Sequence, residues 1–237
     1  MMGMILIGWQ KQPDKLNIQG TIEKAIEEIT GEEVNLTASG RTDRGVHALG
    51  QVANFKTNSN IPIEKFPIAL NSKLKKSIRI LSAEEVEEKF HSRLTCKKKT
   101  YRYIINNSEY GTAIYRNLET HIPMKLNIEK MREAVKNFEG EHDFKAFKAS
   151  GTSSKSSIRI IYKAEVIQMQ NNRIYIELTG NGFLYNMVRI IAGTLVEVGI
   201  GKIEPNEIED IIKSRKRENA GKTLPPQGLY LVKVEYE

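Results

Sequence analysis

Two hydrophobic periodicities run along the chain, and each predicts a type of element. Apolar residues three and four positions apart predict a helix over 21–30, where Gly31 is placed to end it. The same period predicts a second helix over 127–140, with Asn127 as its N-cap. A longer stretch from Phe183 is apolar over most of its circumference and predicts a third helix. The apolar stripes of the first two helices are Ile22, Ala25, Ile26 and Ile29, and Ile128, Met131, Val135 and Phe138.

Apolar and polar residues alternate in the segments between these helices, and this pattern predicts strands. The predicted strands cover 32–39, 50–57, 99–107, 157–169, 172–180 and 228–236, and 77–86 is predicted as a strand that runs into a polar turn. Asn171 and Asn172 separate two of them and predict a hairpin turn. Strands and helices alternate in both halves of the chain, which indicates the α+β fold class. We expect two similar subdomains, 1–92 and 93–237, with a ligand bound in a cleft between them.

The composition gives the net charge of the chain and indicates its cellular compartment. The chain has 237 residues, of which 40% are hydrophobic, and 36 Lys and Arg against 29 Asp and Glu give a net charge of +7. A basic excess favours a polyanionic partner without specifying one. Cys96 is the single cysteine, so no intramolecular disulfide is possible. The start "MMGMILIGWQ" lacks the features of a signal peptide, and no run reaches the roughly 18 apolar residues of a membrane helix. We therefore expect a cytoplasmic protein.

Most standard catalytic motifs are absent from the sequence. It has no Walker loop, no GxGxxG, no HExxH and no paired cysteines. The four histidines are scattered, and "EHD" at 141–143 is a run of three adjacent side chains that rarely converge on one ion. A metal-dependent hydrolase acting on nucleic acid therefore lacks a ligand cluster.

One carboxylate stands out in "SGRTDRGVHALGQVANF", residues 39–55. Asp43 lies between Arg41 and Arg44, with Gly40 and Gly45 just outside them. Opposite charges nearby hold an aspartate ionised, and an ionised carboxylate can act as a nucleophile. An acid that only pairs with its neighbours in a turn fits the same residues equally well.

Two further features have a structural and a functional interpretation. Tyr101 and Tyr103 share one face of a predicted strand, where one of them is expected to be a core residue. A tyrosine at the mouth of a cleft can instead stack on a base or accept a proton. Arg189 lies on the narrow polar stripe of the helix after Phe183, so it is either on the surface or paired with an acid. Gly193, one turn later, leaves room for close approach.

These segments together resemble the TruA family of tRNA pseudouridine synthases. The resemblance covers "GWQKQ…QGTIEKAI", "GRTDRGVHALGQV", "FHSRLTCKKKTYRY", "HDFKAF", "GNGFLYNMVRIIAGTLVEVG" and "GLYLVKVEY", in the family's order and over nearly the whole chain. It implies a pseudouridine synthase fold, in which two α+β subdomains form a continuous mixed or antiparallel sheet with a central basic RNA-binding cleft.

The resemblance also implies an activity and a set of site residues. The activity is the isomerisation of uridine to pseudouridine in the anticodon stem-loop of tRNA, at positions 38–40, by a homodimer without cofactor or metal. Asp43 would be the catalytic carboxylate, Tyr101 the active-site tyrosine and Arg189 the arginine that pairs with the aspartate. The implied substrate-binding residues are Arg41, Arg44, Arg93 and Leu229.

The sequence departs from the family pattern at two places. The family begins with a strand that ends in a "YDG" turn before "GWQ", whereas this chain has only "MMGMILIGWQ". Arg44 follows the aspartate at the position where bacterial members usually have alanine. The alternative function is a non-catalytic RNA-binding protein of the same fold, and the presence of Asp43, Tyr101 and Arg189 together favours the enzyme.

Overall fold

The computed structural model describes residues 8–11, 16–151, 154 and 156–236. Contacts divide the chain into two units. Unit 1 holds residues 1–96 together with 236–237, and unit 2 holds 97–235. Residues 1–7, which precede "GWQ" where the family begins with a strand, lie outside the described residues.

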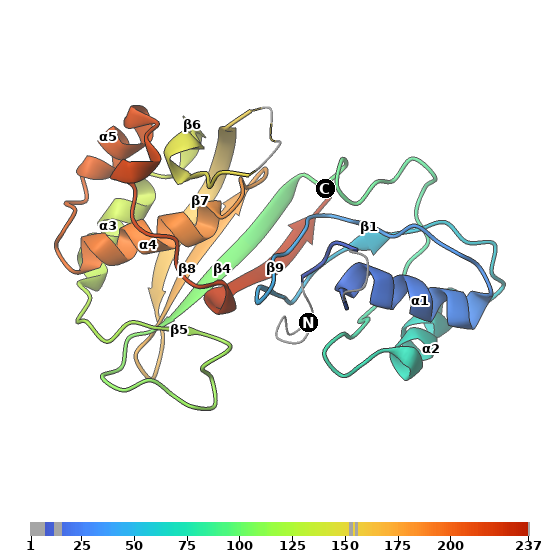
Figure 1. Ribbon diagram of the computed structural model, residues 1–237. Helices are drawn as coiled ribbons and strands as arrows, with labels where there is room; N and C mark the ends of the chain where they lie inside the picture. The colour runs from blue at the N-terminus through green and yellow to red at the C-terminus, as the bar shows by residue number, and fades with distance from the viewer. Residues whose placement is uncertain (1–7, 12–15, 152–153, 155, 237) are drawn as a thin grey trace. The chain divides into compact units, whose positions relative to one another are not determined.

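Unit 1 consists of helices, two-residue strands and long connections (Figure 1). Asn17 caps the first helix by accepting the Gly20 N–H, and Gly31 ends it in the left-handed conformation at φ +76°. This helix and a second one pack a core around Trp9 and Phe66. The elements of unit 1 are α1 (Ile18–Thr30), β1 (Thr37–Ala38), β2 (His47–Ala48), β3 (Ala53–Asn54), η1 (Ile63–Lys65) and α2 (Phe66–Lys73).

Of the strands predicted in unit 1, those over 32–39 and 50–57 are present but only two residues long. β1 and β3 pair antiparallel, with Thr37 opposite Asn54, whereas 77–86 forms no strand. Ile78 of this segment is nevertheless buried in the core and Ile80 packs against that core, whereas Leu81 is 80% exposed. The side-chain amide of Asn71 bonds both the N–H and the C=O of Ile80, at 2.9 and 2.8 Å. A side chain thus satisfies backbone groups that a neighbouring strand would otherwise pair.

Unit 2 is built on a sheet with the strand order β9-β4-β8-β7-β6, and β5 pairs with β4 in parallel (Figure 1). The neighbours along the path β9-β4-β8-β7-β6 pair antiparallel. The strands are β4 (Lys98–Asn106), β5 (Thr120–His121), β6 (Gly140–Asp143), β7 (Ile158–Gln168), β8 (Arg173–Gly180) and β9 (Leu229–Glu235). Asn171 and Asn172 have φ values of +58° and +55°, so the predicted hairpin between β7 and β8 is confirmed, with a turn of the I′ type.

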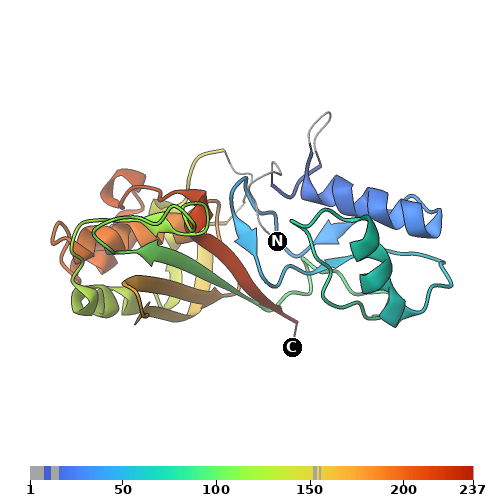
Figure 2. The same cartoon turned by 90° about the horizontal axis from the view of Figure 1, so that it is seen from below.

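Helices cover one face of the unit 2 sheet (Figures 1 and 2). Along β8, Ile174, Ile176 and Leu178 are buried, whereas the residues between them are only half-buried. This alternation is the pattern of an antiparallel sheet with one face packed on a core. The helical segments are α3 (Ile128–Lys136), η2 (Phe144–Phe147), α4 (Met187–Gly199), α5 (Glu207–Ser214), η3 (Arg217–Asn219) and η4 (Pro226–Gly228).

The helices predicted in unit 2 exist, but their ends differ from the prediction. Asn127 caps α3 as expected, by accepting the Lys130 N–H, but the helix ends at Lys136. Gly140 has a φ of +101° and begins β6. The third helix begins at Met187 rather than Phe183, after Asn186 in the left-handed conformation. Within the described residues, no helix is long and apolar enough to cross a membrane.

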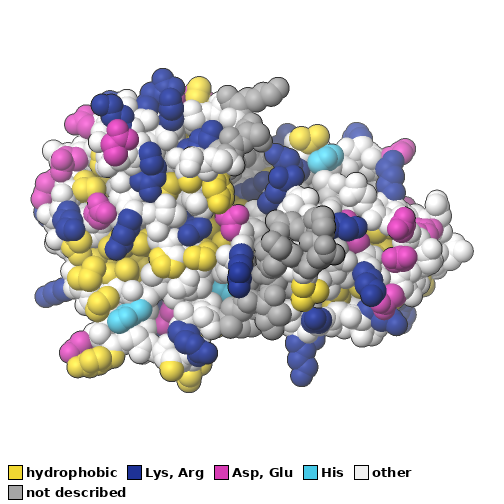
Figure 3. Space-filling view, viewed as in Figure 1, with side chains coloured by type: hydrophobic (Ala, Val, Ile, Leu, Met, Phe, Trp, Pro, Cys, Tyr) yellow, Lys and Arg dark blue, Asp and Glu magenta, His cyan; other side chains and the backbone are white. Residues whose placement is uncertain are grey.

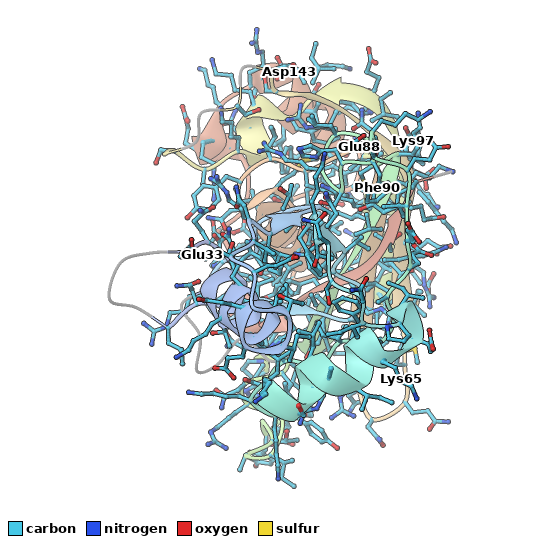
Figure 4. All side chains as sticks on the ribbon, turned by 90° about the vertical axis from the view of Figure 1, so that its right-hand side faces the viewer. Glu33, Lys65, Glu88, Phe90, Lys97 and Asp143 are labelled. Atoms are coloured by element: carbon cyan, nitrogen blue, oxygen red, sulfur yellow. The ribbon has the colours of Figure 1, made fainter. Side chains whose placement is uncertain are left out.

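The α+β fold class is confirmed. The boundary between the two units differs in detail from the one expected between 92 and 93, because residues 93–96 cluster with unit 1. The C-terminal end also clusters there. Tyr236 packs on Phe90, which is labelled in Figure 4, with ring centroids 4.8 Å apart, and donates a 2.8 Å hydrogen bond to Ser92 O.

Candidate active site

The loop around Asp43, here called the GRTD loop (residues 39–46), is fixed at its start by backbone and side-chain bonds within unit 1. Buried Ser39 donates its N–H to Val52 O at 2.8 Å, and its hydroxyl contacts Gln51 Oε1 at 2.6 Å. The amide of Gln51 in turn donates to Gly40 O at 2.8 Å. These bonds set where the loop leaves β1.

The "GW" pair at the N-terminal end of the described chain supports the middle of the loop. The Trp9 N–H donates to Thr42 O at 2.9 Å, and the Trp9 ring is buried in the unit 1 core. Gly8 has a φ of +97°, and a Cβ there would lie 2.7 Å from Thr42 O. Only glycine fits such a position without strain or clash. The family motif "GWQ" thus has a structural explanation as the support of the GRTD loop.

A tight turn presents Asp43. Its carbonyl accepts the Val46 N–H at 3.1 Å, and Gly45 at the third position has a φ of +84°. A positive φ at this position is the signature of a type II turn, and it explains Gly45. Asp43 and both flanking arginines, Arg41 and Arg44, are exposed. The loop therefore presents a carboxylate between two accessible cations, as the sequence indicated.

Thr42, next to Asp43, has a buried hydroxyl group that is energetically unfavourable. The residue is 5% exposed, and among the described residues its hydroxyl is a buried side-chain polar atom without a hydrogen-bond partner. Leaving a buried donor unpaired costs about 1–3 kcal/mol. A cost of this kind beside an exposed carboxylate favours a functional over a purely structural interpretation of the loop.

Tyr101 and Tyr103 lie on β4 and differ in their surroundings. Tyr103 is fully buried, and its hydroxyl donates to Pro225 O at 2.7 Å and contacts the Thr120 hydroxyl at 2.5 Å. Burial raises the pKa of Tyr103 above its ordinary value, an effect that the Thr120 hydrogen bond and the charge of Arg189 partly offset. Tyr103 is therefore the core residue of the two.

Tyr101 is half-buried and contacts Phe183 edge-to-face, with centroids 5.1 Å apart. Edge-to-face contact leaves the two rings tilted and fixes their orientation. Phe183 belongs to the segment before α4, here called the GNGF segment (residues 180–186). The sequence pattern assigned Phe183 no role, although an aromatic residue after two glycines is a signal for a close packing contact.

Arg189 lies in the first turn of α4 and is half-buried. Its Nε donates to Leu224 O and its Nη1 to Asn186 Oδ1, each at 2.7 Å. Asn186 ends the GNGF segment, so the same segment orients both Tyr101, through Phe183, and Arg189. Asp43 belongs to unit 1, whereas Tyr101 and Arg189 belong to unit 2 and are positioned there by one short piece of chain.

Gly193 has the close neighbour that its position suggested. A Cβ at Gly193 would lie 1.8 Å from Lys222 O, and one at Gly221 would lie 2.6 Å from the Thr194 nitrogen. The segment 220–224 therefore packs backbone to backbone on α4 and brings Leu224 O to Arg189. The group that approaches Gly193 closely is therefore the backbone of Lys222, in the same chain.

The two remaining predicted site residues are Arg93 and Leu229. Arg93 is exposed in unit 1, where its N–H donates to His91 Nδ1 at 3.2 Å. Leu229 begins β9 opposite Tyr103 and is 8% exposed, so it can offer a substrate only a small apolar surface. Lysine and arginine side chains are spread over the visible face of both units (Figure 3). No three His, Cys, Asp or Glu residues of the described chain lie together as a metal site requires.

Comparisons with known proteins agree over nearly the full length. A family model described as tRNA pseudouridine synthase matches residues 7–94 and 134–237. A protein named tRNA pseudouridine synthase A from Caldicellulosiruptor saccharolyticus is 53% identical over 234 residues, which cover 99% of this chain and 96% of the relative. The protein of that name from Acetivibrio thermocellus is 52% identical over 229 residues, covering 97% and 93%. A Clostridium perfringens protein named tRNA pseudouridine synthase A 2 is 50% identical over 234 residues, covering 99% and 96%.

Among solved structures, the crystal structure of the archaeal box H/ACA sRNP Nop10-Cbf5 complex matches with a TM-score of 0.40 and 12% identity. The match covers 92% of this chain and 58% of that chain.

Proposed function

Because the chain belongs to the tRNA pseudouridine synthase family, we propose that it isomerises uridine to pseudouridine in tRNA. The observation that carries this proposal is 53% identity over 99% of the chain to a protein named for that reaction. The net charge of +7 suits a polyanionic substrate.

The reaction rearranges one nucleotide without adding or removing atoms. The bond between N1 of the base and C1′ of the ribose breaks, the base rotates, and C5 bonds to C1′ instead. C5 loses its proton and N1 gains one. The target base must first leave its stack so that side chains can reach it. The protein therefore has to supply a carboxylate, a surface that holds the detached base and a proton acceptor.

Asp43 is the residue that we propose as the catalytic carboxylate. Its exposure on a turn held at both ends supports this role, since an accessible and oriented carboxylate is what the chemistry needs. The carboxylate either attacks the nucleotide covalently or takes a proton from the ribose, and both routes require the ionised form.

Tyr101 and Arg189 are proposed to act on the same nucleotide as Asp43. Tyr101 is the tyrosine with an accessible part, and its ring can hold the detached base while its hydroxyl accepts the C5 proton. Arg189 has a guanidinium whose position two neutral oxygens fix, and it is proposed to keep Asp43 ionised during the reaction.

The proposed RNA contacts are made by Arg41, Arg44 and Arg93, all exposed, and by the apolar surface of Leu229. Arginine binds phosphate through a planar fork of donors, so these residues suit the RNA backbone. The proposed target is the anticodon stem-loop, at positions 38–40 of the tRNA.

The enzyme is further proposed to be a cytoplasmic homodimer that needs no cofactor or metal. Sedimentation velocity at micromolar concentration should show the mass of two chains, and a monomer in an active preparation would refute the dimer. Dialysis against a chelator should leave the activity unchanged.

The test compares wild-type protein with Asp43→Asn on an unmodified tRNA transcript. Pseudouridine is mapped nucleotide by nucleotide, and tRNA binding is measured on the same samples. Asp43→Asn should keep its fold and its tRNA affinity and lose isomerisation on the order of a thousandfold or more, because the amide is neither nucleophile nor base. Asp210→Asn, an exposed aspartate on α5, is the matched control and should react as wild type does.

Each outcome separates the interpretations. Pseudouridine in the anticodon arm with wild type and Asp210→Asn only would establish the reaction and the role of Asp43. Turnover by Asp43→Asn at the wild-type rate would refute that role. Binding without isomerisation by any of the three proteins would support the non-catalytic RNA-binding alternative.

A further inference from the structure

Arg159, on β7 in unit 2, is a half-buried arginine whose hydrogen bonds go only to neutral oxygens among the described residues. Its Nη1 donates to the carbonyls of Ser156 and Ile158, and its Nη2 donates to Ser154 Oγ at 3.1 Å. Burial without a compensating carboxylate lowers the pKa of Arg159 from its ordinary value, although a guanidinium stays charged at neutral pH. A partly desolvated cation of this kind is favourable chiefly when an anion is available to it.

Lys148 brings a second positive charge to the same place. The residue is half-buried, and its Nζ lies 3.4 Å from Ser154 O. Ser154 thus contacts Arg159 through its hydroxyl and Lys148 through its carbonyl. Within the described part of the chain, the hydrogen-bond partners of Lys148 and Arg159, here called the cation pair, include no carboxylate. Two like charges held together repel each other unless an anion lies between them.

The described residues around Arg159 offer no hydrogen-bond acceptor to one edge of its guanidinium. A Cβ at Gly182 would lie 3.7 Å from Arg159 Nε and 3.8 Å from its Cδ, so glycine there keeps a side chain away from this edge. Nε and one Nη2 hydrogen have no hydrogen-bond acceptor among the described residues. An adjacent Nε and Nη2 form the fork that arginine uses to bind a phosphate or carboxylate through two parallel bonds.

The cation pair lies beside the segment that positions the candidate site residues of unit 2. Asn181 bonds Ile160 twice, through its N–H and its Oδ1, each at 3.0 Å. The N–H of Ala149, next to Lys148, donates to Tyr185 O at 3.1 Å. Both chain segments that carry the cation pair are therefore attached to the GNGF segment, which also holds Phe183 against Tyr101.

We propose that Lys148 and Arg159 together bind one backbone phosphate of the RNA substrate, next to the nucleotide that is isomerised. This inference rests on the proposed function for the identity of the substrate. One phosphate accepts two hydrogen bonds from the Nε–Nη2 fork of Arg159 and interacts with the charge of Lys148, and its negative charge relieves their repulsion. A fixed flanking phosphate sets the register of the strand when the target base leaves its stack.

The test measures tRNA affinity as a function of salt for Lys148→Gln and Arg159→Gln. Each variant should bind about five to ten times more weakly than wild type at 0.1 M salt, and the slope of log K against log salt should decrease in magnitude by about 0.7–0.9, the change for one lost phosphate contact. Lys213→Gln is the matched control because Lys213 is an exposed lysine of unit 2 that is ion-paired with Glu209 at 2.9 Å. It removes the same charge and should change neither quantity.

The double variant tests whether the two residues share one phosphate. If they do, Lys148→Gln combined with Arg159→Gln should lower the slope by about one contact rather than two, because effects on one partner are not additive. A decrease equal to two contacts would overturn the shared phosphate. If Arg159→Gln fails to fold, Lys148→Gln alone still measures the change in affinity and salt slope for one lost phosphate contact. Lys148→Gln is expected to fold, since the one described hydrogen bond of the Lys148 side chain is 3.4 Å long.

Other outcomes separate this inference from the function on which it rests. If wild-type protein isomerises tRNA and both variants match Lys213→Gln in affinity and slope, the phosphate site is overturned and the function stands. If wild-type protein neither binds nor isomerises tRNA, both are overturned.

Discussion

At the scale of single residues, Tyr101 and Tyr103 show how two similar side chains acquire different roles. They are two positions apart on one strand and share a face. Tyr103 is surrounded by Thr120 and Pro225, whereas Tyr101 meets Phe183 and keeps an accessible part. The sequence predicted that one tyrosine would be a core residue, and the neighbours that select Tyr103 come from distant parts of the chain.

This difference predicts opposite effects of removing each hydroxyl. Tyr103→Phe should lower the free energy of unfolding by about 1–2 kcal/mol, since two buried hydrogen bonds are lost, and should keep isomerisation within about twofold. Tyr101→Phe should leave stability within about 0.5 kcal/mol and slow isomerisation at least tenfold when the hydroxyl accepts the proton. Urea denaturation and single-turnover assays of both variants measure these quantities. Full activity of Tyr101→Phe would limit its role to stacking, and an activity loss confined to Tyr103→Phe would reverse the assignment.

At the scale of elements, the strand predictions were less accurate in unit 1 than in unit 2 for one reason. Alternation of apolar and polar residues reports which side chains face a core, and it does not report what pairs with the backbone. In unit 2 long neighbouring strands are present, and the pattern becomes a sheet. In unit 1 side chains replace the neighbouring strand: Glu23 accepts the Leu36 N–H at 3.1 Å, and Gln19 donates to Leu36 O at 3.2 Å.

Helix α4 shows a second dependence on tertiary contacts, through Gly193. Gly193→Ala should lower the free energy of unfolding by about 3 kcal/mol or more, because the new Cβ would overlap Lys222 O and the backbone must move. It should also slow isomerisation, since the displaced segment carries Leu224 O, which holds Arg189.

Gly31→Ala is the control for this variant. Gly31 has a φ of +76°, and a Cβ added there would meet no atom within 4 Å, so its replacement should cost only about 1 kcal/mol of backbone strain and leave activity unchanged. Thermal and urea denaturation compare the two variants. A Gly193→Ala protein no less stable than Gly31→Ala would contradict the packing explanation.

At the scale of the whole molecule, the C-terminal end of the chain belongs to unit 1, the unit that also contains the N-terminal residues. Tyr236 lies 144 positions after Ser92 in the sequence and bonds its carbonyl, and it packs on Phe90. The contacts of unit 1 therefore include Tyr236, which follows all of unit 2 in the sequence. A contact over this distance has a large loop-closure cost, which the intervening fold of unit 2 reduces.

Removing this contact should destabilise unit 1 selectively. Tyr236→Ala should lower its unfolding free energy by about 2–4 kcal/mol, through the lost ring packing and hydrogen bond. Hydrogen exchange should show faster exchange in α1 and α2 and unchanged exchange in β4, β8 and α4. Tyr110→Ala, at a tyrosine 78% exposed, should change neither region. Equal acceleration in both units would mean that they unfold as one.

The sequence by itself determined the features that depend on neighbours along the chain. These include the Asn127 cap at the start of α3, the Asn171–Asn172 hairpin and the family motifs that indicate the reaction. Caps and turns involve residues a few positions apart, so their physics is contained in a short window. Tertiary structure alone decided that Tyr103 is buried, that Lys222 packs on Gly193, and that Lys148 and Arg159 converge on Ser154. Each of these depends on which distant segments meet, because burial, close packing and charge repulsion act through space rather than along the chain.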